Sequence, residues 1–136
     1  MNFIYEEITI NTNNKVELIN ITSRIVEIIN SNNVSSGLVN VSTKHTTSSI
    51  IINEDEEGLK KDIINLYDEI IPFSNYCHDR IDNNARSHLK SLISISNQTL
   101  PIINGKLGLG TWQDIFFVEF DGPRKMRKIN VTIMGQ

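Results

Sequence analysis

The sequence is poor in several residue types, and each shortage excludes a class of protein. It has one cysteine, Cys77, which excludes an intrachain disulfide framework and a zinc cluster built from thiolates. It has one alanine, so its helices must be held by packing rather than by intrinsic helix propensity. It has three histidines, few enough for each to be considered as a chemical group in its own right.

Long apolar runs and excess positive charge are also missing. No segment approaches the roughly 18–20 apolar residues of a membrane span, and residues 1–10 lack the basic segment and apolar core of a secretory signal. We therefore expect a cytoplasmic protein with no membrane partner. The net charge of −3 disfavours binding to nucleic acid.

The residues that are present predict one domain over residues 1–136, rich in isoleucine (23) and asparagine (17). Apolar alternation predicts strands, the first two forming a hairpin and the last four a meander around an Asn104-Gly105 turn. We expect an α+β fold, with a curved, mainly antiparallel sheet (a half-barrel or meander) and two or three helices packed on it. The predicted strands cover 3–10, 16–19, 37–44, 48–53, 98–103, 106–109, 112–120 and 125–134.

Three helices are predicted from periodicity and charge. The first follows Asn20 and buries isoleucines spaced by three and four residues; the third covers residues 84–93. The second opens near Glu54 with four acidic residues, which suit a helix N-terminus, and ends before Pro72. Its expected buried stripe is Leu59, Ile63, Leu66, Tyr67 and Ile70.

His45 stands at the end of a predicted strand and is followed by four hydroxyl residues, beginning with Thr46. An imidazole beside hydroxyl groups suits a metal ligand or general base with additional contacts to phosphate. The same composition is also common in polar turns between strands. Both interpretations stay open from the residues alone.

His78 and His88 are ten residues apart, one in a predicted loop and one on the following helix. The spacing allows the rings to converge if the loop folds back over the helix, and neutral imidazoles suit zinc and other divalent metals. The alternative is two solvated histidines. Cys77 beside His78 is either a nucleophile or a buried thiol without a chemical role.

Three further positions carry candidate chemistry. Glu54 is a general base, a metal ligand or only a helix-dipole partner. Trp112 and Gln113 offer an aromatic plane and an amide to a flat heterocycle, unless the tryptophan belongs to the core. Arg124 leaves a tight turn and suits a phosphate through its planar guanidinium, unless it is a solvated charge.

Taken together, these blocks resemble the YjbQ-type family, whose members are named secondary thiamine-phosphate synthases. The resemblance is carried from Gly37 to Gly135 by short motifs in fixed order. They are Gly37-Leu38-Val39, His45-Thr46-Thr47, Ile52-Asn53-Glu54, His78, Asn84-Ala85, His88-Leu89-Lys90, Leu100-Pro101-Ile102, Gly105-Lys106-Leu107, Gly110-Thr111-Trp112-Gln113 and Glu119-Phe120-Asp121-Gly122-Pro123-Arg124.

The resemblance implies a small α+β domain that assembles as a homotrimer. It implies that His45, His78 and His88 gather around a divalent metal near a subunit interface, with zinc the expected ion. It also implies that Asn84, Trp112, Gln113 and Arg124 contact the substrate, and we add Thr46 to this group because of its hydroxyl beside His45.

The expected function is that of a metal-dependent enzyme of small phosphorylated metabolites. The activity after which the family is named joins a hydroxymethylpyrimidine pyrophosphate to a thiazole phosphate. Our candidate for the acid–base residue is Glu54. The alternatives are a non-enzymatic trimer that binds metal or metabolite in the same pocket, and a trimer in which the histidines only form interface hydrogen bonds.

Overall fold

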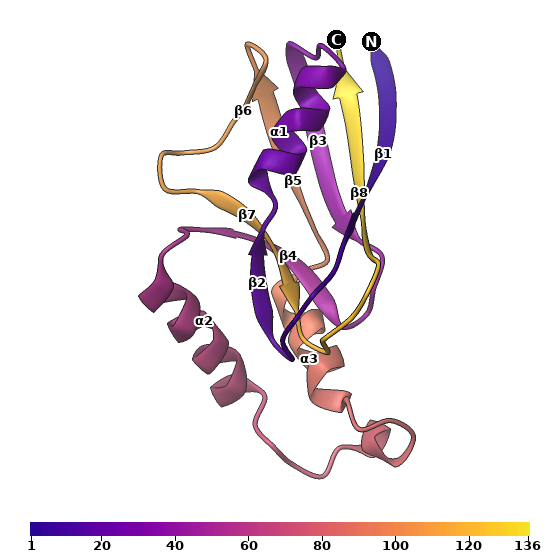
Figure 1. Ribbon diagram of the computed structural model, residues 1–136, viewed down its shortest axis with the longest axis vertical. Coiled ribbons are helices and arrows are strands. Elements are labelled where there is room, and N and C mark those ends of the chain that lie inside the picture. The colour runs from indigo at the N-terminus through magenta and orange to yellow at the C-terminus, as the bar shows by residue number, and fades with distance from the viewer.

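The chain folds into two antiparallel sheets and three α-helices, which confirms the predicted α+β class (Figure 1). The computed structural model describes residues 1–136. None of the helices is long and apolar enough to cross a membrane. In chain order the elements are β1 (Asn2–Ile10), β2 (Glu17–Asn20), α1 (Thr22–Ser31), β3 (Ser36–Thr43), β4 (Ser48–Asn53), α2 (Glu57–Ile70), the 3₁₀ turn η1 (Cys77–Arg80), α3 (Ala85–Ser94), β5 (Asn97–Ile103), β6 (Lys106–Leu107), β7 (Asp114–Glu119) and β8 (Arg127–Gly135).

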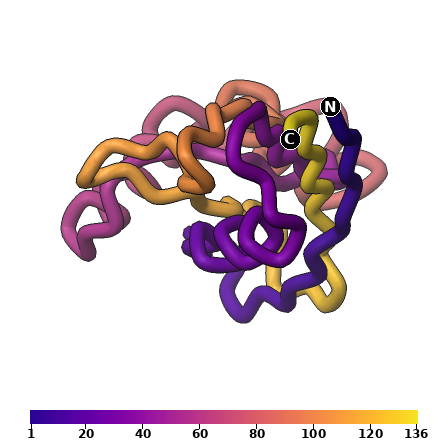
Figure 2. Tube along the Cα trace, turned by 90° about the horizontal axis from the view of Figure 1, so that it is seen from above, coloured from indigo at the N-terminus to yellow at the C-terminus, as the bar shows by residue number.

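The larger sheet has the strand order β1-β8-β3-β5-β6 and curls into a half-barrel, while the smaller sheet has the order β2-β7-β4. Both termini lie at one end of the larger sheet, where β1 runs beside β8 in both views of the chain (Figures 1 and 2). The smaller sheet crosses the lower half of the molecule and carries α3 near its end (Figure 1).

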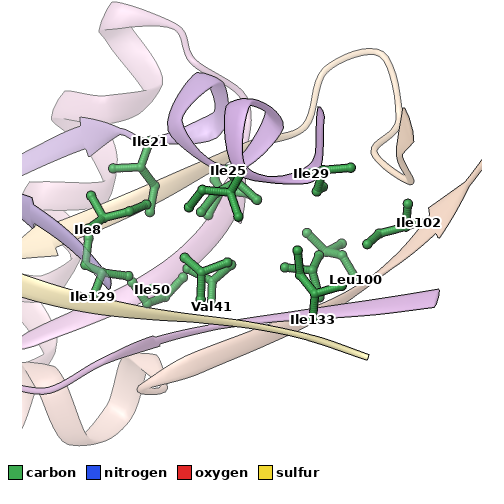
Figure 3. Packing of buried hydrophobic residues seen from close by; sticks show 14 of the residues in the cluster. Ile8, Ile21, Ile25, Ile29, Val41, Ile50, Leu100, Ile102, Ile129 and Ile133 are labelled. Atoms are coloured by element: carbon green, nitrogen blue, oxygen red, sulfur yellow. The ribbon is translucent and has the colours of Figure 1, made fainter. Parts of the chain in front are cut away.

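The main core lies between α1 and the curled sheet. Ile25 and Ile29 of α1 are fully enclosed and face the strands, as predicted from their spacing (Figure 3). β-branched side chains from several strands complete this apolar cluster and pack well on a pleated surface. The chain's one alanine lies outside α1, so the helix is stabilised by this packing. The enclosed strand residues include Ile8, Val39, Val41, Ile50, Ile115, Phe117, Ile129, Val131 and Ile133.

The predicted hairpin of the first two strands is wrong. β1 pairs with β8 in the larger sheet, whereas β2 pairs with β7 in the smaller one. The connection between them is fixed by the β7–β8 loop, because the Thr12 N–H donates to the Arg124 carbonyl at 2.8 Å and the Met126 N–H donates to Asn11 Oδ1 at 2.9 Å. These long-range contacts direct the chain from one sheet to the other.

The C-terminal meander is only partly present. Asn104 and Gly105 both have positive φ angles and form the predicted hairpin between β5 and β6. After that hairpin β7 joins the smaller sheet, and β8 returns to lie between β1 and β3. The last four strands are therefore divided between two sheets.

Helix α2 differs from its prediction at both the start and the apolar face. It begins at Glu57, because the Glu56 carboxylate accepts the N–H groups of Gly58 and Leu59 and caps the first turn. No residue of α2 is buried, so the predicted buried stripe is wrong for the single chain: Leu66 is 54 % and Ile70 53 % exposed. Of the predicted stripe, Tyr67 packs its ring edge-on against Phe120, with 4.9 Å between the ring centroids.

Because Ile25 is fully buried, we expect Ile25→Ala to lower the free energy of unfolding by about 2–5 kcal/mol, since the deleted atoms leave a cavity under α1. Urea unfolding followed by circular dichroism measures this loss. Val26→Ala, on the exposed side of the same helix, is the matched control and should change stability by less than about 0.5–1 kcal/mol. Equal losses in the two variants would contradict this placement of the core.

Candidate functional site

A polar cluster lies where the β3–β4 connection, the end of β7 and the start of α3 meet. Glu119, the last residue of β7, is paired in register with Ser48 at the start of β4. Helix α3 is attached to the same corner, since Ser87 Oγ donates to the Phe120 carbonyl at 2.7 Å and Ser91 Oγ donates to the Ser48 carbonyl at 2.6 Å. We define the polar cluster as His45, His78, Asn84, His88, Asp121 and Arg124.

The base of the polar cluster is a buried ion pair between Glu119 and Arg127. Arg127 donates through Nε to Glu119 Oε1 at 2.8 Å, and its Nη2 binds Glu119 Oε2 and Thr47 Oγ1. Thr12 Oγ1 and the Asp121 N–H also donate to the same carboxylate, at 2.7 and 3.1 Å. Burial raises the pKa of Glu119, but these hydrogen bonds outweigh it and hold the pKa below its usual value.

Asp121 connects the β7–β8 loop to α3. Its carboxylate accepts from Lys15 Nζ at 2.5 Å, from Arg124 Nη2 at 2.8 Å and from Asn84 Nδ2 at 2.9 Å. Burial raises the pKa of Asp121, but the three donors lower it by more, so the pKa lies below its usual value and the carboxylate stays ionised. An ionised Asp121 can only accept hydrogen bonds, which fixes the amide of Asn84 with its NH₂ group toward Asp121.

His78 and His88 converge, as their spacing allowed. The Asp79 carboxylate accepts the Ala85 N–H at 2.9 Å, which ties the 3₁₀ turn η1 to the first turn of α3. The two imidazole rings then lie edge-to-face with centroids 4.7 Å apart. His78 Nε2 is 3.0 Å from Asn84 Oδ1, so Asp121, Asn84 and His78 form one hydrogen-bonded chain.

His45 occupies a separate position in the polar cluster. Its Nε2 accepts the backbone N–H of Lys128 at 2.8 Å, and its own N–H donates to Thr43 Oγ1 at 3.2 Å. Burial lowers the pKa of His45, and the nearby charges of Arg127, Lys44 and Arg124 lower it further against the opposing effect of Glu119. The ring is therefore held neutral.

The chain alone does not assemble a three-ligand metal site. No three His, Cys, Asp or Glu side chains lie together in an arrangement that could hold a metal ion. His78 and His88 present two imidazoles to one space, whereas zinc sites in proteins have three or four protein ligands. His45 would have to release the Lys128 N–H to join them, so coordination by all three histidines stays a prediction.

Four predicted residues lie outside the polar cluster, three of them at the opposite end of the smaller sheet. Asn53 pairs with Asp114, so Glu54, Trp112 and Gln113 lie at least six residues of strand away from the Ser48–Glu119 end, roughly 20 Å. Trp112 is 72 % exposed and is not part of the core. Thr46 lies next to His45 and is exposed, with no hydrogen bond from its side chain.

Sequence reasoning missed the ion pair beneath the cluster. Neither Arg127 nor Glu119 was among the candidate functional residues, yet the two side chains form a buried ion pair. The signal was available, because Arg127 begins the alternation that continues with Ile129 and Val131 on the inward face of β8. Cys77, expected to be buried if it had no role, is exposed beside His78.

The fold and the polar cluster define a small α+β protein with paired imidazoles next to a carboxylate–arginine network, and comparison with known proteins assigns this class. The family model described as "UPF0047 protein YjbQ-like" matches residues 6–136, and the chain belongs to this family. A UPF0047 protein of Methanothermobacter thermautotrophicus is 44 % identical over 96 % of this chain and 92 % of its own length. The UPF0047 protein YugU of Bacillus subtilis is 35 % identical over 93 % of this chain and 96 % of its own length.

Solved structures show the same fold. The crystal structure of a YbjQ-like protein of unknown function from Sulfolobus solfataricus superposes with a TM-score of 0.96, at 35 % identity and with 99 % of both chains covered. A YjbQ/UPF0047 family protein from Clostridium acetobutylicum superposes with a TM-score of 0.89, at 38 % identity, covering 95 % of this chain and 99 % of its own. These names give the family and no activity.

The buried pair predicts that Glu119→Gln lowers the free energy of unfolding by about 3–5 kcal/mol at neutral pH, because Arg127 keeps a buried charge without a counter-charge. Denaturant unfolding measures the loss, with the exposed Glu27→Gln as control. The folded-state pKa of Glu119 lies below the usual 4.5. The ionised carboxylate therefore contributes its full stabilisation of the fold above pH 4.5, and this stabilisation is lost as the pH falls through the lowered pKa. The difference between wild type and variant should therefore narrow in acid; a constant difference would contradict the pairing.

Proposed function

We propose that the chain is a metal-assisted enzyme of small phosphorylated metabolites, with its site in the polar cluster. The observation that carries the proposal is the chain from Asp121 through Asn84 to His78. A histidine that binds a metal through one ring nitrogen commonly donates a hydrogen bond from the other ring N–H to a carboxylate or an amide oxygen. This hydrogen bond orients the ring. Here that support is present on His78, and the second imidazole, His88, faces the same space.

The chemistry of the two imidazoles suits a borderline metal such as zinc rather than magnesium, which prefers oxygen ligands. With Asn84 Oδ1 accepting from His78 Nε2, the lone pair of His78 remains on Nδ1. We propose zinc as the ion, with His78 and His88 supplying two of the three or four ligands that such a site needs. Such an ion, when bound, would neutralise charge that develops on a phosphorylated ligand.

Arg124 supports the phosphate part of the proposal. Its Nε and Nη2 bind the Asp121 carbonyl and carboxylate, which fixes the plane of the guanidinium and leaves Nη1 for a ligand. The side chain is half exposed, so an anion can approach it. Lys15, bound to the same carboxylate and mostly exposed, adds a second positive charge, and the free hydroxyl of Thr46 adds a neutral donor.

As the specific reaction we propose the thiamine-phosphate synthase activity that the sequence resemblance implies, in which the pyrimidine pyrophosphate and the thiazole phosphate are joined and pyrophosphate leaves. Both reactants and the leaving group are anions, which matches the uncommitted donors of Arg124, Lys15 and Thr46. Fixed donors at the oxygens of a departing pyrophosphate stabilise the charge that develops on it. Asn84 acts in this proposal by orienting His78.

A homotrimer is the assembly that we propose. The aliphatic side chains of α2 that remain half exposed, Leu66 and Ile70, form with Ile63, Ile93 and Ile51 an apolar groove along the smaller sheet. Contact between copies through such a surface removes apolar area from water. It also offers a way for Glu54, Trp112 and Gln113 of one copy to approach the polar cluster of another.

One observation favours the alternative, a metal- or metabolite-binding protein without turnover. Both carboxylates of the corner, Glu119 and Asp121, are engaged by cations, and hydrogen bonds lower the pKa of each. Neither is therefore suited to exchange a proton near neutral pH. The acid–base candidate Glu54 lies at the far end of the smaller sheet, so turnover in this proposal depends on the assembly.

We retain the cytoplasm as the proposed compartment, in keeping with the one free cysteine.

The metal proposal predicts that His78→Ala and His88→Ala each lower zinc affinity more than about a hundredfold, and that Asn84→Ala lowers it about tenfold to a hundredfold. Competition with a chromophoric chelator measures these affinities. Cys77→Ser is the matched control, since it changes the neighbouring side chain of the same turn and should leave zinc affinity unchanged. If wild type binds no zinc, or the histidine variants bind it equally well, the metal proposal fails.

The same proteins test the reaction. Wild type loaded with zinc should form thiamine phosphate from the two precursors, and the two histidine variants should lose most of this activity. Zinc binding and protection of the protein by pyrophosphate against heat, with no product, would instead support the alternative of binding without turnover.

The exposed face of α2 predicts that Leu66→Lys reduces the mass of the assembly in sedimentation experiments, because a charge in an apolar contact is unfavourable. Asn65→Lys makes the same charge change at the neighbouring exposed position and should leave the assembly intact. A monomeric wild type, or an equal effect of both substitutions, would exclude this face as the contact between copies.

A further inference from the structure

The hydrogen bond from Lys128 to His45 determines where the proton of that imidazole lies. A backbone N–H can only donate, so His45 Nε2 at 2.8 Å must carry a lone pair. The ring is then neither an imidazolium nor the Nε2–H form. Its proton is on Nδ1, which is the minor form of histidine in water.

This position is built into the fold. Lys128 lies on β8, and its N–H is set by the antiparallel pairing of β8 with β1, in which Lys128 stands opposite Thr9. His45 is held from its own backbone by Thr43, whose Oγ1 accepts the His45 N–H and also bonds Ser48 Oγ at 2.6 Å. No hydrogen bond within the chain uses His45 Nδ1, so its N–H is available to a ligand.

His78 has the opposite arrangement. Asp121 fixes the NH₂ group of Asn84, so Asn84 presents an oxygen to His78 Nε2, which must therefore be the N–H. His78 Nδ1 keeps the lone pair. At Nε2, therefore, His45 accepts a hydrogen bond whereas His78 donates one.

We propose that His45 is a fixed hydrogen-bond donor, through its Nδ1–H, to an anionic oxygen of a phosphorylated ligand, and that it is not a metal ligand. The assignment of the ligand rests on the proposed function, whereas the assignment of the proton does not. Of the charges that act on the His45 ring, those of Arg127, Lys44 and Arg124 favour a bound anion, and that of Glu119, which is already paired with Arg127, opposes it. The three positive charges oppose a bound cation at this position.

The first test locates the proton directly. Long-range ¹H–¹⁵N correlation spectra of protein labelled with ¹⁵N-histidine contain three ring systems, which are assigned by substituting each histidine in turn. At mildly alkaline pH and without ligand, His45 should show the Nδ1–H form and His78 the Nε2–H form. The Nε2–H form or a mixture at His45 would overturn the proposal, whatever the outcome of the activity assays.

The second test uses a pair of substitutions that separate the two ring nitrogens. In His45→Asn the amide nitrogen takes the place of Nδ1, so the donor is kept but the acceptor for the Lys128 N–H is lost. In His45→Gln the amide oxygen reaches the place of Nε2, so the acceptor is kept and the donor is lost. Affinity for inorganic pyrophosphate, zinc affinity and the midpoint of urea unfolding are measured for both.

The expected pattern is crossed. His45→Gln should bind pyrophosphate about tenfold to a hundredfold more weakly and keep its unfolding midpoint, since a hydrogen bond to a charged oxygen contributes in that range. His45→Asn should bind within about threefold of wild type and have the lower midpoint. Zinc affinity should stay unchanged in both. Loss of zinc affinity in both variants would make His45 a metal ligand and overturn the proposal, while failure of zinc binding in wild type would overturn only the proposed function.

Discussion

The ion pair between Glu119 and Arg127 is the interaction on which the rest of the structure depends. Glu119 ends a strand of the smaller sheet, and Arg127 begins a strand of the larger one, so the pair joins the two sheets at their shared corner. Removing two charges from water is expensive unless every donor and acceptor is used. Here Thr12, Thr47 and the Asp121 N–H complete the hydrogen bonds of the pair, which brings the β1–β2 and β3–β4 connections to the same point.

The polar cluster takes its geometry from that corner. With the loop after β7 held by Glu119, the Asp121 carboxylate is fixed, and through Asn84 it fixes the ring of His78. The adjacent N–H of Lys128, one residue beyond Arg127, fixes His45. Two imidazoles are thus positioned from one buried ion pair, His78 through Asp121 and Asn84 and His45 through a backbone N–H. Preorganisation of this kind places polar groups before a ligand arrives.

Local features of the fold could be predicted from the sequence, and non-local ones could not. The stripe of Ile25 and Ile29 and the Asn104-Gly105 turn depend on spacing and backbone preference within a few residues, and both are present. The pairing of β1 with β8 and of β2 with β7 joins segments about a hundred residues apart, which alternation cannot specify. In the site, the ten-residue spacing of His78 and His88 allowed their convergence to be predicted. The partner of His45 is a backbone N–H, which every residue except proline has, so the sequence could not indicate it.

The place of β8 in the larger sheet has a consequence for how the protein is made. This strand is the last element of the chain, yet it lies between β1, which is the first, and β3. While the chain leaves the ribosome, β1 therefore has no partner until residues 127–135 have emerged, and β3 has only β5. Domains with such distant pairings fold slowly and expose unpaired strand edges in the interval. The nascent chain therefore exposes unpaired edges of β1 and β3 until β8 has emerged.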